Sequence, residues 1–141
     1  MAELRQATGL LRIATPGRAL VEITGEVNRW VAAQGMAQGL LTLFCRHSSA
    51  SLVIQENAAP AVRADLLAWL DRAVPEGAHY AHDDEGPDDM PAHIKTMLTG
   101  VSIGVPLIGG ALALGTWQGV YLVEHRRAPH ARQVALHLIG A

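Results

Sequence analysis

Along most of this chain, short segments of apolar residues are separated by polar and turn residues, and this pattern predicts more strands than helices. Residues 39–47 form a predicted strand rich in apolar residues, and the alternation of side chains along a strand places Leu41, Leu43, Cys45 and His47 on one face. A glycine pair between two later segments predicts a hairpin turn. The predicted strands span residues 10–13, 20–24, 39–47, 51–56, 101–106, 111–114, 116–124 and 132–140.

Three other segments have helical periodicity. Thr24 is positioned to cap a helix over residues 26–34, and Pro91 is positioned to open a short helix over residues 91–98. The clearest helix covers residues 60–73, where apolar residues recur at helical spacing: Val62, Leu66, Trp69, Leu70 and Ala73.

These elements place the chain in the α+β class, with a mostly antiparallel sheet or sandwich packed with two to three helices. A length of 141 residues suits a single domain, residues 1–141, with a sizeable core. The apolar runs are too short to cross a bilayer, and the first residues lack a secretory pattern. Cys45 is the single cysteine, which excludes an internal disulfide and predicts a reducing, cytoplasmic compartment.

Charge and motifs exclude several classes of function. The formal net charge of −2 argues against nonspecific nucleic-acid binding, because there is no basic excess to neutralise phosphates. The chain also lacks a Walker-type phosphate loop, a dinucleotide glycine fingerprint, a nucleophile elbow and a Cys-x-x-Cys pair.

Titratable side chains are most concentrated in residues 82–93, where twelve positions hold two histidines, five carboxylates and two prolines. Such a cluster repels itself unless a cation or a cationic ligand sits among its members. We expect His93 in the first turn of a helix, where the dipole disfavours the charged ring and leaves a nitrogen free for a metal, while the neighbouring carboxylates favour the charged ring; the alternative is a hydrogen bond to Asp89. His82 precedes carboxylates that could accept its second ring proton, although an exposed acidic loop with an incidental histidine is the alternative.

Two further histidines compete for a place in this site. His47 ends a strand beside the hydroxyls of Ser48 and Ser49, which makes it a candidate third ligand or general base. His125 is the competitor, but the arginines that follow it disfavour a nearby cation. Cys45 shares its face with leucines, and we interpret it as a core residue.

Several other polar residues lie at the ends of predicted elements. Arg127, next to Arg126, is a candidate for binding an anionic group such as phosphate. Glu124 and His125 alternate along their strand, so one of the two faces the site. Three residues could orient a substrate, each with an ordinary alternative as a cap or turn residue: Asn57, Thr116 and Gln118.

Four segments together resemble the YjbQ-like family. They are Arg-His-Ser-Ser-Ala-Ser-Leu at 46–52, Gln-Glu-Asn-Ala at 55–58, the histidine and acid block at 82–95, and Leu-Gly-Thr-Trp-Gln-Gly at 114–119. The match runs in order from about residue 42 to the last strand, and the block at 82–95 with Gly-Thr-Trp-Gln-Gly is highly specific. The family usually has threonine where this chain has Ser48, which keeps the hydroxyl.

The resemblance implies an α+β fold that assembles as a homotrimer and binds a divalent metal, often zinc, with magnesium or manganese as alternatives. It also implies a secondary thiamine-phosphate synthase. Such a transferase joins a hydroxymethylpyrimidine diphosphate to a thiazole phosphate and releases pyrophosphate, so its partners are small phosphorylated metabolites. Carried onto this chain, the resemblance makes Glu124 a site carboxylate and assigns three metal ligands: His47, His82 and His93.

In that reaction a metal would polarise the departing diphosphate, while Arg127 and either Ser48 or Ser49 bind phosphate oxygens. Asp84 or Glu124 would stabilise positive charge on the pyrimidine methylene or accept a proton. Two alternatives from other classes stay open. One is a metal-dependent hydrolase of a small phosphate or amide, and the other is a metal- or metabolite-binding module without turnover.

Overall fold

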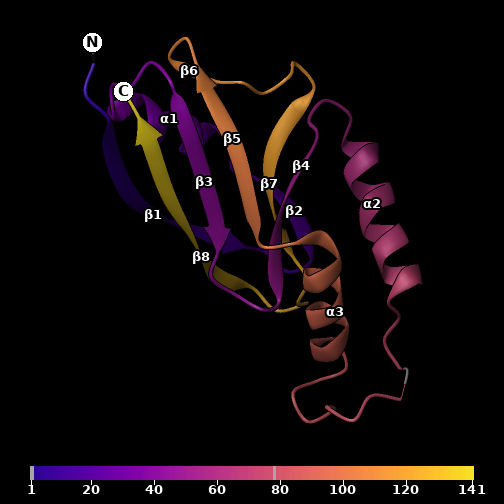
Figure 1. Ribbon diagram of the computed structural model, residues 1–141. Coiled ribbons are helices and arrows are strands. Elements are labelled where there is room, and N and C mark those ends of the chain that lie inside the picture. Colours follow the sequence, from indigo (N-terminus) through magenta and orange to yellow (C-terminus); the bar gives the residue numbers. More distant parts are fainter. Residues whose placement is uncertain (1, 78) are drawn as a thin grey trace.

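Two antiparallel sheets and three helices make up residues 2–77 and 79–141, which the computed structural model describes (Figure 1). The larger sheet has the strand order β1 (Arg5–Thr15), β8 (His130–Gly140), β3 (Gly39–Cys45), β5 (Ser102–Ile108) and β6 (Ala111–Leu112). The smaller sheet has the order β2 (Ala19–Glu22), β7 (Gln118–Glu124) and β4 (Ala50–Glu56). The predicted α+β class with antiparallel pairing is confirmed.

The hydrophobic core lies between the two sheets. On β3 the predicted alternation is confirmed, because Leu41, Leu43 and Cys45 are buried while Leu40 and Phe44 point to the opposite, exposed face. The strand ends at Cys45, so His47 lies beyond the sheet in the connection to β4.

Helix α1 (Thr24–Ala33) packs its buried face, Val27 and Val31, against this core. The prediction that Thr24 caps the helix through its side chain is wrong. The Thr24 hydroxyl instead donates to Glu22 and accepts the amide of Val120, because the helix begins where β2 ends beside β7.

Helices α2 (Pro60–Ala73) and α3 (Asp89–Thr99) lie over the face of the smaller sheet that points away from the core (Figure 1). Position in this outer layer leaves much of the predicted apolar stripe of α2 near solvent. Leu70 is the buried residue of α2, whereas Trp69 is 56% exposed.

Helix α3 begins at Asp89, two residues before the predicted start at Pro91. Pro91 is tolerated as the third helical residue because the first amides of a helix have no intrahelical acceptor. The carboxylate of Asp88, just before the helix, is held by Arg126 and by the amide of Arg127. Because the helix already includes Asp89, the side chains of Asp89 and His93, four residues apart in sequence, lie on one face of the helix.

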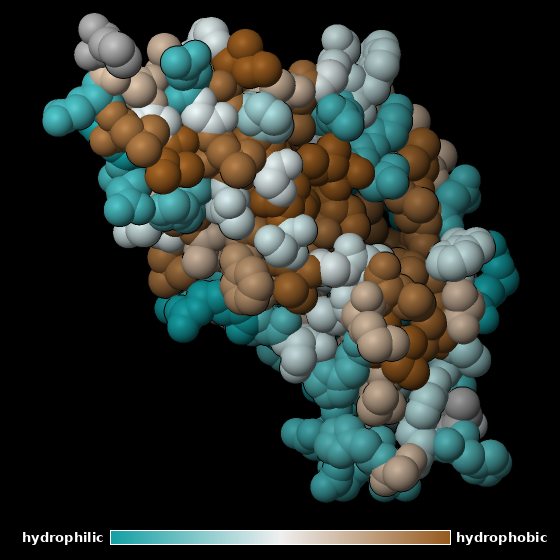
Figure 2. All heavy atoms as spheres, viewed as in Figure 1, coloured by the Kyte–Doolittle hydropathy of each residue, from teal (hydrophilic) through white to brown (hydrophobic). Residues whose placement is uncertain are grey.

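The outer face of the larger sheet is covered by no helix in the described part of the chain. In Figure 2, hydrophobic residues gather over β3 and β5, while the end of the molecule below α3 is hydrophilic. Within residues 2–77 and 79–141, none of the helices has both the length and the hydropathy that a membrane span requires.

Candidate functional site

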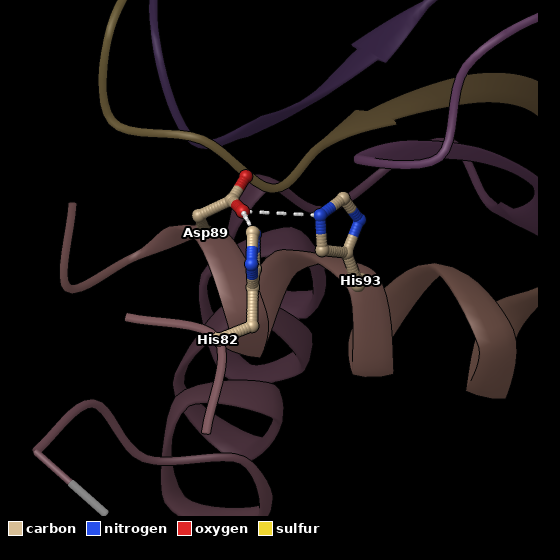
Figure 3. Close-up of side chains that lie close together, drawn as sticks. All are labelled: His82, Asp89 and His93. Atoms are coloured by element: carbon tan, nitrogen blue, oxygen red, sulfur yellow. Dashed lines mark hydrogen bonds and ion pairs between the residues drawn. The ribbon is translucent and has the colours of Figure 1, made fainter. Parts of the chain in front are cut away.

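Three side chains converge where the acidic loop meets the start of α3 (Figure 3). The Asp89 Oδ2 atom lies 2.9 Å from Nε2 of His82 and 3.1 Å from Nε2 of His93. Asp89 comes from the first turn of α3 and His93 from the next, whereas His82 reaches the same point from the loop. The side chain of Asp89 is only 4% exposed, so this carboxylate forms the buried floor of the cluster.

The hydrogen bonds of His93 show which of its two ring nitrogens directs a lone pair toward the cluster. Nδ1 of His93 donates to the carbonyl of Ser48 at 2.8 Å, because a carbonyl oxygen only accepts. In the neutral ring Nε2 then carries no proton, and its lone pair points at the Asp89 oxygen. Two acceptors facing each other repel unless a proton or a metal cation lies between them.

Arg126 orients the carboxylates below the cluster. Its Nη1 atom donates to Oδ1 of Asp89 at 2.7 Å and its Nε atom to Oδ2 of Asp88 at 3.0 Å. Partial burial raises the pKa of Asp88, but hydrogen bonds from Arg126 and from the Arg127 amide bring this pKa below its ordinary value. Because Oδ1 of Asp89 is occupied by Arg126, Oδ2 is the oxygen left for a ligand.

His82 has further acidic neighbours on its exposed side. Nε2 of His82 lies 2.8 Å from Oε2 of Glu85, and Nδ1 lies 3.4 Å from Oδ1 of Asp84. The hydrogen bond to Asp89 is the main cause of a raised His82 pKa; desolvation, the next largest effect, lowers this pKa, while Glu85 and Asp84 raise it. The predicted site residue Asp84 is therefore close to the cluster, but on its solvent side.

His47 lies near the cluster without joining it. Among the described residues, the ligand atoms that lie within 4.8 Å of one another are those of His82, Asp89 and His93, and those of His82 with two exposed acids. Nε2 of His47 accepts the amide of Gln133 at 2.8 Å. Partial burial, and then the charge of Arg132, lower the pKa of His47. His47 as a metal ligand stays a prediction, and Asp89 takes the third position in the observed group.

The structure places Glu124, the predicted site carboxylate, in a buried ion pair. Both oxygens of this fully buried residue bind Arg132, and they also accept the Thr15 hydroxyl at 2.7 Å and the Arg126 amide at 3.1 Å. Burial raises the pKa of Glu124, but the hydrogen bonds from Arg132 and Thr15 bring it below its ordinary value. Four donors leave this carboxylate little capacity to take a proton, so its contacts indicate a structural role.

The other predicted substrate-binding residues are not all gathered at the cluster. The Ser48 carbonyl holds His93, and Ser49 accepts Arg132 with both its hydroxyl and its carbonyl. Arg127 pairs with Glu76 through an exposed side chain.

Three more predicted residues lie at the far end of β7. Asn57 donates to the backbone carbonyls of Thr116 and Gln118, and the Gln118 side chain accepts the amide of Gly115. These contacts are of the structural kind foreseen as the alternative. Seven strand residues, about 20 Å, separate this group from Arg126 at the other end of β7.

His125, the competitor, and Cys45 are both core residues. His125 is 2% exposed and its Nε2 atom lies 2.9 Å from the Ser51 hydroxyl. Burial, and then the charge of Lys95, lower the pKa of His125 to about 4, so the ring is neutral. The Cys45 thiol donates to the Ala50 carbonyl, and burial raises its pKa, which does not favour a nucleophile.

Sequence reasoning missed the roles of Asp89 and Arg126. The sequence predicts Asp89 as one of five carboxylates that orient the histidines or cap the helix and as a hydrogen-bond partner of His93, but not as a metal ligand. An Asp and a His four residues apart would have indicated one helix face. Arg126 was expected to repel a cation; instead its charge is matched by Asp88 and Asp89.

Fold and site together define an α+β protein with an antiparallel two-sheet core and a partly exposed His–Asp–His cluster beside its outer helices. The family model described as "UPF0047 protein YjbQ-like" matches residues 10–141. The chain therefore belongs to the YjbQ-like UPF0047 family, as the sequence resemblance predicted.

Individual relatives agree with this assignment. The chain is 49% identical to UPF0047 protein sll1880 of Synechocystis over 99% of this chain and 95% of that protein. It is 39% identical to the YjbQ protein of Escherichia coli O157:H7 over 92% and 95% of the two chains. A crystal structure of a YbjQ-like protein of unknown function from Sulfolobus solfataricus P2 has the same fold, with a TM-score of 0.92 at 24% identity over 99% and 100% of the chains.

Proposed function

We propose that this protein is a divalent-metal-dependent enzyme acting on small phosphorylated metabolites, with the metal bound by His82, Asp89 and His93. The reaction that we propose is the one implied by the family resemblance, the coupling of a hydroxymethylpyrimidine diphosphate to a thiazole phosphate. In this coupling the thiazole nitrogen lone pair forms the new C–N bond, and the methylene C–O bond breaks to release pyrophosphate. We expect it to occur in the cytoplasm.

The observation that supports metal binding most strongly is the convergence of three possible ligand atoms, Nε2 of His82, Oδ2 of Asp89 and Nε2 of His93. Ligand atoms of a tetrahedral zinc site with bonds of about 2.0–2.1 Å lie about 3.3 Å apart. The separations of 2.9 and 3.1 Å from Oδ2 of Asp89 to the two histidines come close to this value. Two imidazoles and one carboxylate are a common set for catalytic zinc, and three protein ligands leave a fourth position for substrate.

Groups around the cluster support each proposed ligand. Ser48 holds the ring of His93 through Nδ1, and Arg126 holds Asp89 through Oδ1, so both ligand atoms are oriented before a metal binds. The bound ion would act as a Lewis acid on the departing diphosphate. Glu85 and Asp84, on the solvent side of His82, are placed to attract a cation to the site.

Metal binding is tested with two carboxylate variants. Asp89→Asn places an amide, with its N–H donors, against the two histidines, whereas Asp84→Asn removes an exposed carboxylate beside the same His82. We expect isothermal titration calorimetry with Zn²⁺ to give one site per chain, at least tenfold weaker in Asp89→Asn and nearly unchanged in Asp84→Asn. Equal affinity in both variants and the wild type would refute this ligand set.

The reaction is tested by product analysis with the zinc-loaded protein. A synthase needs both substrate halves and forms thiamine phosphate and pyrophosphate in equal amounts. Consumption of the diphosphate alone, with water, would identify the hydrolase alternative. Tight binding without any product at stoichiometric enzyme would leave only the binding module. Asp89→Asn should lose turnover together with zinc.

We also propose the homotrimer implied by the resemblance. The uncovered face of the larger sheet supports an assembly, because exposed apolar side chains gather there on β3, β5 and β8 (Figure 2): Leu40, Phe44, Ile108 and Ile139. Three 15.0 kDa chains make a particle of about 45 kDa, which sedimentation velocity distinguishes from a monomer. Phe44→Lys should dissociate it, and a wild-type monomer at micromolar concentration would refute it.

A further inference from the structure

A groove of about 800 Å³ lies on the uncovered face of the larger sheet, where β3 begins and where β5 and β8 end. Large apolar side chains that are 37–71% exposed line it: Leu4, Leu40, Ile108 and Ile139. They offer roughly 400 Å² of apolar surface, which is within the range of the largest patch on a typical monomer. Three of them also support the proposed homotrimer, so the groove is continuous with the surface proposed to bind another copy.

A ring of three identical chains needs two different surfaces on each chain. Every copy in such a ring contacts its two neighbours through unlike patches, one on each side. The groove supplies only one of these patches, so a projecting surface that fits it has to lie elsewhere on the same chain. Tryptophan side chains inserted into a pocket of the partner often dominate the binding energy of a protein interface.

Trp117 has the properties of such an anchor. It is 65% exposed and lies between β6 and β7, on a turn in which the Gln118 amide donates to the Gly115 carbonyl at 3.0 Å. The Gly115 amide donates to the Gln118 side chain at 2.8 Å, and the Asn57 side chain donates to the Thr116 carbonyl at 3.3 Å. These bonds hold the turn in one shape, so Trp117 loses little conformational entropy when it binds a partner.

Trp117 and the groove lie at the same end of the two-sheet core. Gly110, in the turn after β5, and Gln118, at the start of β7, line one smaller hollow. Figure 1 likewise shows the connection from β6 to β7 at the end of the molecule where β3 begins and β8 ends. A threefold axis along the strands keeps every residue at its own height, so it can bring Trp117 of one copy to the groove of the next.

The other exposed apolar side chains fit this role less well. Met97 and Leu98 lie near the end of α3, next to the start of β5, whereas the groove lies at the other end of that strand. Trp69, 56% exposed, lines a separate cavity with Leu66 and Leu70 of its own helix. Trp117 is therefore better placed to enter the groove of a neighbouring copy.

We propose that Trp117 of each chain inserts into this groove on the next copy, and that three such contacts close the ring of the homotrimer. The indole packs on Leu40, Ile108 and Ile139 and buries about 150–250 Å² of its own surface. The groove supplies about half of the roughly 800 Å² that one partner buries in a stable interface, and the adjoining sheet face with Phe44 extends it. The inference rests on the proposed homotrimer and is independent of the proposed metal chemistry.

Fluorine NMR of the protein labelled with 5-fluorotryptophan tests the contact without a change of sequence. Exchange of H₂O for D₂O shifts a fluorine resonance where solvent reaches the ring. In the assembled protein the Trp117 resonance, assigned with Trp117→Phe, should lose most of this shift. The Trp69 resonance should keep it, because α2 lies outside the proposed contact. A Trp117 resonance that keeps its full solvent shift in the trimer would overturn the proposal, because another part of the neighbour would then fill the groove.

Two matched pairs of variants assign the two sides of the contact by sedimentation velocity. Trp117→Ser and Ile108→Asp should each sediment as a 15.0 kDa monomer. Trp69→Ser and Leu98→Asp, which change similarly exposed side chains elsewhere, should remain trimers. The difference should be large, because an aromatic anchor contributes about 30-fold or more to the affinity of one contact and the ring contains three.

Equimolar mixing distinguishes loss of the contact from loss of the fold. Trp117→Ser keeps its groove and Ile108→Asp keeps its Trp117, so one chain of each kind can form a single intact contact. At high concentration the mixture should form a dimer, while each variant alone stays a monomer. A trimer in either variant alone, or a mixture that stays monomeric, would overturn the docking of Trp117 while the homotrimer stands. A monomeric wild type would overturn the homotrimer and the docking with it.

Discussion

The buried pair of Glu124 and Arg132 allows a structural role to be separated from a catalytic one by a single change. Glu124→Gln keeps the shape of the side chain but removes its charge. One end of the new amide would turn N–H groups toward the guanidinium of Arg132 and the amide of Arg126, which now donate to Oε2. The variant therefore leaves a buried guanidinium without its carboxylate.

The expected cost follows from the burial of both partners. Glu124 is fully buried and Arg132 is 5% exposed, so solvent screens their interaction little. Loss of one member of a buried ion pair costs about 3–5 kcal/mol, because the other charge stays buried without compensation. A chain of this length has an unfolding entropy of about 0.3 kcal/mol/K, so the melting temperature should fall by about 10–17 °C.

Urea unfolding followed by tryptophan fluorescence measures this change, with the exposed Glu3→Gln as the control. The double variant Glu124→Gln/Arg132→Met also lacks the charge of the Arg132 guanidinium. Its free energy of unfolding should therefore be at least about 1 kcal/mol higher than the summed effects of the two single variants predict. Zinc affinity should match that of the wild type throughout. Unchanged stability combined with lost turnover in Glu124→Gln would refute the structural role and support catalysis.

Two further predictions concern the core. The pKa of His125 is about 4 in the folded protein and about 6.5 in the unfolded chain. As the pH falls, the unfolded chain therefore takes up a proton before the folded protein does. The free energy of unfolding should drop by up to about 3 kcal/mol between pH 6.5 and 4. Urea titrations of His125→Gln should lack this part of the pH dependence, and curves parallel to the wild type would contradict it. Gly9→Ala should cost about 1–3 kcal/mol, because a Cβ atom there would lie 2.3 Å from Nε1 of Trp30, whereas Gly104→Ala meets its nearest neighbour at 3.7 Å. Equal thermal melts of these two glycine variants would show that Trp30 moves aside without cost.

Local patterns were sufficient for most of the elements. The apolar run at β3 predicted a strand, and the period of two placed Cys45 on one face with two leucines, the face that is buried. The boundaries were less accurate. The start of α3 depends on Asp88, which is held by Arg126 from a segment 38 residues away, and no local pattern contains that contact.

The same distinction applies to the candidate site. The sequence alone determined that the chain has a YjbQ-like α+β fold, and that residues 82–93 hold an unusual density of imidazole and carboxylate groups. These are properties of residue type and spacing. Only the tertiary structure decided that Asp89 joins His82 and His93, because Ser48 and Arg126 orient two of those side chains from other segments. The tertiary structure also decided that Glu124 is surrounded by hydrogen-bond donors, since Thr15 and Arg132 contact it from β1 and β8. The residues next to Glu124 in sequence do not indicate this burial, because the strands that cause it are distant in sequence.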